Sequence, residues 1–127
     1  MPKKLWLLAA VGWTLLVTLA CLSSFGGFPK VGIPSADKYV HVIFHFVFTI
    51  LWCFYFQSRR RYSNNVKIAF SIVLLSAVFG AAIEIAQEVF TTTRQADIMD
   101  LLANLSGAIL AATVVTIYNW LFKKKYY

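Results

Sequence analysis

The sequence predicts an all-α membrane protein: a bundle of four transmembrane helices with both chain termini in the cytoplasm. Hydrophobic residues make up 60% of the 127 residues and charged residues only 13%, and the mean hydropathy is +0.70. This composition is typical of membrane proteins rather than of soluble domains. Four long apolar runs divide the chain, each long enough to cross a hydrocarbon layer of about 30 Å. Basic residues cluster at the ends of these runs, which indicates how the spans are oriented.

The first predicted span covers residues 5–22 and follows a short basic tail that contains Lys3 and Lys4. A basic tail before an apolar run is also typical of a cleaved signal peptide, and the position of Cys21 resembles a lipoprotein cleavage site. However, Thr18 stands where such sites usually carry leucine, and three more spans follow. We therefore expect a retained helix.

The composition of the segments between the spans predicts a loop and two turns. Residues 23–37 contain three glycines and two prolines and are predicted to form a loop. Residues 58–65 form a basic turn, and residues 91–95 a short turn. The three remaining spans are predicted at 39–57, 66–90 and 96–122. We expect residues 1–127 to form a single membrane domain.

The basic residues are distributed unequally between the two ends of the spans. Nine basic residues fall on one side with no acidic residue: Lys3, Lys4, Arg59, Arg60, Arg61, Lys67, Lys123, Lys124 and Lys125. The other side has three basic residues and all five acidic ones: Lys30, Lys38 and Arg94, with Asp37, Glu84, Glu88, Asp97 and Asp100. Because cytoplasmic loops are enriched in Lys and Arg, the termini are expected inside and the acidic residues outside.

Two other classes of function are disfavoured. The basic residues lie at the ends of apolar runs rather than on a polar surface, so we expect no nucleic-acid partner. The two cysteines, Cys21 and Cys53, lie within apolar runs without ligand-like spacing and are expected to be small buried residues. No cofactor is expected.

Polar residues gather between Gly80 and Gly107, in a stretch that holds four of the five acidic residues. On the third span, the spacing i, i+3, i+4 places three of them on one helix face: Glu84, Gln87 and Glu88. On the fourth span, the spacing i, i+3, i+7, i+10 does the same for Asp97, Asp100, Asn104 and Gly107. The turn between them is short, so these spans should be antiparallel neighbours.

The second span adds His41 and His45 to this polar group. Counting inward from the outer ends, His45, Glu84 and Asn104 should lie at matching depths, roughly 9–11 Å below the rim. Ionisable groups that face lipid at such depths are costly, so we expect all of these side chains to point inward. Gly80 and Gly107 are expected where the third and fourth spans approach most closely.

Three segments in this order resemble the VanZ-like family of small bacterial membrane proteins. They are DKYVH, EIAQ and RQADIMDLLANLSG, and His45 and Glu88 are not part of the shared pattern. The residues that carry the pattern are Asp37, Lys38, His41, Glu84, Gln87, Arg94, Asp97, Asp100, Asn104 and Gly107. The resemblance implies a multi-pass protein of the bacterial cytoplasmic membrane. Because the family's named member is linked to low-level teicoplanin resistance, the resemblance also implies a cell-envelope role.

We interpret the polar group as an outward-facing pocket that binds or modifies an envelope component. The expected ligand-binding residues are Asp37, Lys38, His41, Glu84, Gln87, Arg94, Asp97, Asp100 and Asn104. Lys38 and Arg94 are suited to hold a phosphate or carboxylate of a lipid-linked or peptidoglycan-type ligand. His41 and Glu84 are the candidates for acid–base catalysis. We also expect Arg94, His41 and Glu84 to share one hydrogen-bonded network, with Asp100 bridging its upper layer.

Several alternatives stay open at this point. The polar residues could be structural, closing the outer turn through ion pairs, helix caps and bonds between helices. The protein could be a membrane-embedded enzyme that acts on a lipid-linked phosphate, or a small transporter, which with four spans would have to oligomerise. Metal binding is disfavoured and none is expected, because the histidines lack the HExxH context and basic residues nearby oppose a cation.

Overall fold

The computed structural model describes residues 1–23, 35–59, 64–92 and 94–123. These residues form four helices: α1 (Lys3–Leu22), α2 (Ala36–Arg59), α3 (Asn65–Phe90) and α4 (Ile98–Lys123). All four are long and apolar enough to cross a membrane, with mean hydropathies of 2.2, 1.7, 2.3 and 1.8 in their most apolar windows. The predicted all-α fold class, a four-helix transmembrane bundle, is thereby confirmed.

Some sequence-based expectations lie outside the described residues. They concern residues 24–34 of the first loop, Arg60 and Arg61 of the basic turn, and the end of the basic tail from residue 124 onward. The second loop ends at Asn64, whose side-chain oxygen accepts hydrogen bonds from the backbone N–H groups of Val66 and Lys67, at 3.0 and 3.3 Å. This cap fixes the start of α3.

The start of α4 is fixed by Asp97, not by the apolar run alone. Its Oδ1 accepts a hydrogen bond from the backbone N–H of Met99 at 2.8 Å, so the helix begins at Ile98 rather than at the expected residue 96. On α2 the boundary moves the other way. The helix begins at Ala36, which places Asp37 inside its first turn.

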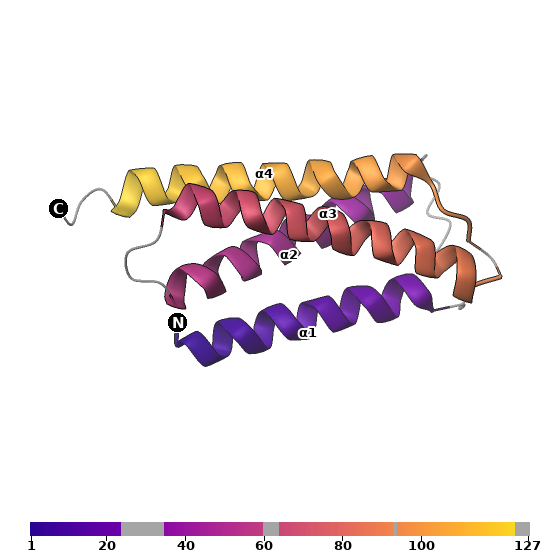
Figure 1. Ribbon diagram of the computed structural model, residues 1–127, viewed down its shortest axis with the longest axis horizontal. Coiled ribbons are helices and arrows are strands. Elements are labelled where there is room, and N and C mark those ends of the chain that lie inside the picture. The colour runs from indigo at the N-terminus through magenta and orange to yellow at the C-terminus, as the bar shows by residue number, and fades with distance from the viewer. Residues whose placement is uncertain (24–34, 60–63, 93, 124–127) are drawn as a thin grey trace.

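The helices lie side by side along the long axis and alternate in direction (Figure 1). The start of α1, the end of α2, the start of α3 and the end of α4 lie at one end of the bundle, and the end of α3 and the start of α4 lie at the other. The most extensive interface joins α2 to α4, while α2 also packs against α1 and α3. The arrangement is an up-and-down bundle in which α2 is the shared neighbour.

The distribution of side chains is inverted relative to that of a soluble protein. The largest fully buried side chains include His41, His45, Gln87 and Asn104, each at most 2% exposed. In contrast, large apolar side chains cover the outer surface, including Leu19 on α1, Val78 on α3 and Ile98 on α4, at 68–75% exposure. Such a surface is suited to lipid, with polar groups satisfied inside. The protein is therefore a multi-pass membrane protein.

Helix α1 is held in the bundle by hydrogen bonds as well as by apolar packing. The indole N–H of Trp13 donates to the carbonyl of Phe44 at 3.0 Å, and that of Trp52 donates to the Thr14 hydroxyl at 3.2 Å. Cys21 on α1 is buried, as expected, and so is Cys53 on α2; both are free thiols. In this structure α1 is an integral part of the bundle.

The two glycines serve different interfaces. A Cβ placed on Gly80 would lie 2.9 Å from Nδ2 of Asn104, so α3 does approach α4 there, as expected. A Cβ placed on Gly107 would instead overlap the backbone carbonyl of Val42 on α2. The expectation that Gly107 serves the α3–α4 interface is wrong. At Gly107, α4 packs closely on α2, a pairing that sequence neighbourhood does not reveal.

The orientation of the bundle across the membrane stays a prediction. We expect reporter fusions after Asn64 and after Tyr127 to report cytoplasm, and a fusion after Thr92 to report the outside, because of the basic-residue bias. Paired alkaline phosphatase and fluorescent-protein fusions would measure this. Phosphatase activity from the Asn64 fusion, together with fluorescence from the Thr92 fusion, would reverse the orientation.

Candidate functional site

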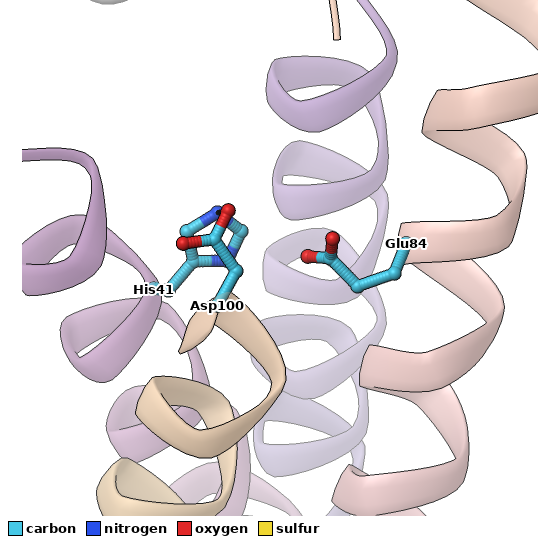
Figure 2. A group of neighbouring side chains, drawn as sticks. All are labelled: His41, Glu84 and Asp100. Carbon is cyan, nitrogen blue, oxygen red and sulfur yellow. Dashed lines mark ion pairs between the residues drawn. The ribbon is translucent and has the colours of Figure 1, made fainter. Parts of the chain in front are cut away.

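Three ionisable side chains from three helices converge at the end of the bundle that holds the α3–α4 connector. They are His41 of α2, Glu84 of α3 and Asp100 of α4, which we call the His–Glu–Asp cluster. One ligand atom from each lies within 4.8 Å of the other two, and the three residues are 2%, 5% and 8% exposed. Glu84 points across from α3 towards the other two side chains (Figure 2).

The helix boundaries explain why these residues meet. Asp100 lies in the first turn of α4, His41 in the second turn of α2, and Glu84 six residues before the end of α3. At about 1.5 Å per residue, all three lie within roughly two turns of helix ends that share one end of the bundle. The cluster is thus positioned by backbone elements rather than by a loop.

Lys38 joins α2 to the start of α4. Its Nζ donates to Oδ2 of Asp97 at 2.9 Å and to Oδ1 of Asp100 at 2.8 Å, and lies 3.6 Å from Oδ2 of Asp37. The Lys38 ammonium lowers the pKa of Asp97, and the hydrogen bond from the Met99 N–H adds to this effect. Because Lys38 is already engaged by carboxylates of the protein, it is poorly placed to hold a phosphate.

The orientation of His41 is set by Asn104, which is fully buried. Nδ1 of His41 lies 3.0 Å from Oδ1 of Asn104. Because an amide oxygen can only accept a hydrogen bond, the tautomer of His41 that satisfies this contact carries its proton on Nδ1. The other ring nitrogen, Nε2, lies 3.6 Å from Oδ2 of Asp100, which is beyond hydrogen-bonding distance. In the neutral ring, Nε2 therefore presents a lone pair to the cluster.

Glu84 is anchored through one of its two carboxylate oxygens. Oε2 accepts a hydrogen bond from the backbone N–H of Asp97 at 3.1 Å, while Oε1 is buried without a hydrogen-bond partner among the described residues. Gln87, one turn further along α3, points elsewhere. Its Nε2 donates to the carbonyl of Cys21 at 3.0 Å and so ties α3 to α1.

The polar side chains make contacts that counting residues does not predict. Asn104 contacts His41, while His45, one turn further along α2, forms a 2.7 Å hydrogen bond with Ser76. Asn104 and His45 both lie beside Gly80 of α3. Ser76 is the partner that sequence reasoning missed. Its position two turns before Glu84 on the same helix face was the available signal.

Glu88 and Arg94 are the two residues still to be placed. Glu88, which the family pattern omits, is exposed on α3. Arg94 is half-buried in the connector that leads into α4. Its membership in a network with His41 and Glu84 stays a prediction.

The charge around the cluster is predominantly negative. All five carboxylates belong to this end of the bundle: Asp37, Glu84, Glu88, Asp97 and Asp100. Lys38 is in direct contact with three of them, and Arg94 in the connector is the second basic residue. A group that donates hydrogen bonds or carries positive charge is therefore better matched to this cluster than an anion.

Four membrane-crossing helices with a buried ionisable cluster at one end define a small multi-pass membrane protein. The chain belongs to the family described as VanZ/LLP1, which it matches over residues 6–121. It is 29% identical over 106 residues to an uncharacterized protein of the fission yeast Schizosaccharomyces pombe, a match that covers 83% of this chain and 62% of that protein. The chain thus spans less than two thirds of this relative. No solved structure matches it.

Proposed function

We propose that this protein acts in the bacterial cell envelope, where the His–Glu–Asp cluster binds or modifies an envelope component at the outer surface of the cytoplasmic membrane. An effect on glycopeptide susceptibility of the teicoplanin type would follow. The observation that supports this most is the burial of three ionisable groups within 4.8 Å of one another inside a membrane bundle. Interhelical hydrogen bonds in membranes average only about 0.6 kcal/mol, so stability alone is a weak reason for them.

The chemistry of the cluster narrows the ligand class. Oε1 of Glu84 and Nε2 of His41 are acceptors without a hydrogen-bond partner among the described residues. Lys38 already donates to Asp97 and Asp100. An amine or hydroxyl group of an envelope component fits these acceptors better than the phosphate that the sequence favoured. If a reaction occurs, Glu84 and His41 are the groups suited to take up its proton.

A second candidate is a small transporter, and one structural feature favours it. Along α2, residues at four-residue spacing form a buried series that continues beyond the cluster: His41, His45, Thr49, Cys53 and Gln57. Gln57 accepts a 3.3 Å hydrogen bond from Asn119 on α4. The series consists of polar groups and one thiol, Cys53, which packs in an apolar core with Ile72 and Val115. Transport assays on reconstituted protein would test this candidate.

Substitution of Glu84 by glutamine tests the proposed function. The change keeps the side-chain shape and removes the charge, so we expect normal membrane levels and loss of the envelope phenotype. Complementation of a deletion strain, scored by teicoplanin susceptibility and with protein levels followed by immunoblot, measures both. Glu88→Gln, an exposed position on the same helix, is the matched control and should retain activity. Full activity of Glu84→Gln at normal levels would assign the cluster a structural role.

A further inference from the structure

We propose that His41, Glu84 and Asp100 bind a divalent transition-metal ion such as Zn²⁺ or Mn²⁺. This goes beyond the proposed function, because the ion would be held by the protein whether or not an envelope ligand is bound. The three residues supply one imidazole nitrogen and two carboxylates, which are ligand types that such ions accept. They come from three different helices, as metal ligands do in the cores of other helical bundles.

The distances among the three residues suit a shared ion. Metal–ligand bonds of about 2.0–2.2 Å place neighbouring ligand atoms roughly 3–4 Å apart. The ligand atoms of the cluster lie within 4.8 Å of one another, and Nε2 of His41 is 3.6 Å from Oδ2 of Asp100. Only a small inward movement of Glu84 would be needed, and this side chain already points towards the other two (Figure 2).

Each of the three side chains is anchored through one atom and leaves another available. His41 is held through Nδ1 by Asn104, Glu84 through Oε2 by the backbone of Asp97, and Asp100 through Oδ1 by Lys38. The atoms left for the cluster are Nε2, Oε1 and Oδ2. Partners that hold the outer atom and orient the inner one are typical of metal sites.

Two of these inner atoms have no hydrogen-bond partner among the described residues, although their side chains are at least nine-tenths buried. They are Nε2 of His41 and Oε1 of Glu84. A lone pair on Nε2 that faces the Asp100 carboxylate is repulsive, and either a proton on Nε2 or a metal ion between the two groups removes this repulsion. A metal ion would bind both unpartnered atoms and would also lie between Nε2 of His41 and Oδ2 of Asp100.

Of the two basic residues that the structure describes at this end of the bundle, Lys38 does not oppose this site as the sequence suggested. Lys38 contacts Oδ1 of Asp100, whereas Oδ2 is the oxygen that faces His41. Lys38 also contacts Asp97, so its charge is already balanced outside the cluster. The remaining carboxylates leave a negative charge that a dication would neutralise. Three protein ligands would leave a coordination position open for water or for a ligand.

Metal content and metal binding of the purified protein test this proposal. The full chain, purified in detergent through a tag free of histidine and stripped with chelator, should bind about one Zn²⁺ or Mn²⁺ per chain, as expected for one three-ligand site. Mass-spectrometric metal analysis and visible absorption after Co²⁺ addition measure stoichiometry and coordination. The thermal unfolding temperature should also rise with metal, because an ion that binds only the folded state stabilises it.

Matched variants assign the site. Glu84→Gln and His41→Gln should lose binding at least tenfold, whereas Glu88→Gln and His45→Gln should bind as the unchanged protein does. Loss of binding in the first pair alone supports the site. Absence of stoichiometric binding by the unchanged protein, or equal binding by Glu84→Gln, would overturn the proposal. Since the measurements use purified protein, failure here leaves the complementation experiment on Glu84 independent.

Discussion

Substitution of Gly107 by alanine should prevent most of the protein from folding. A Cβ at this position would overlap the carbonyl oxygen of Val42. The carbonyl carbon and Cα of Val42 would lie 3.0 and 3.1 Å from it. A flexible side chain could move aside, but the obstacle here is the backbone of α2. Overpacking costs about 1–3 kcal/mol where side chains can adjust, and we expect the upper end or more. The penalty falls on the most extensive interface of the bundle.

Folded yield and thermal unfolding in detergent, followed by size-exclusion chromatography, measure this effect. Gly12→Ala on α1 is the matched control, because a Cβ there would meet nothing within 4 Å. It should be neutral or slightly stabilising, since alanine has the higher helix propensity. Equal yields of Gly107→Ala and Gly12→Ala would show that α2 and α4 do not approach as closely as described.

The fold class could be predicted because it depends on features that are local in sequence. Apolar runs of spanning length give four helices, and a short connector makes α3 and α4 antiparallel. The lateral arrangement depends on which faces fit together, and this is not local. Gly107 shows the difference: its small size predicts a close approach, but the partner is Val42 of α2 rather than a residue of α3.

The candidate site shows the same division. Helical spacing and the family pattern selected His41, Glu84 and Asp100 and predicted that they face inward. Their actual contacts depend on the axial offset between helices, which counting residues cannot supply. Asn104 pairs with His41, whereas His45 pairs with Ser76. The role of the Asp97 backbone N–H as the partner of Glu84 has no side-chain signature and could not be predicted.

Substitution of Lys38 by methionine should destabilise the bundle at the end that holds the cluster. The change removes the ammonium group that donates to both Asp97 and Asp100, while methionine keeps most of the length of the lysine side chain. The consequence differs between the two partners. Asp97 has a side chain that is 44% exposed and can be hydrated, whereas that of Asp100 is 11% exposed and would be left without its cation. The Asp100 contact should therefore account for most of the loss.

The size of the effect follows from this burial. Removing one partner of a buried ion pair typically costs about 3–5 kcal/mol, but the Lys38 side chain is 27% exposed and water can partly replace it. We therefore expect a loss of about 1–3 kcal/mol, measured as a lower thermal unfolding temperature in detergent. Chelator should be present, so that a bound cation does not neutralise Asp100 in place of Lys38.

A double-mutant cycle separates the contribution of the charge from that of packing. Asp100→Asn removes the carboxylate that Lys38 neutralises, so the Lys38→Met, Asp100→Asn protein should be more stable than the sum of the two single effects indicates. Asp97→Asn is the matched control and should give little coupling with Lys38→Met, because that pair is solvated. Strict additivity of Lys38→Met with Asp100→Asn would show that the 2.8 Å contact between Lys38 and Asp100 does not stabilise the bundle.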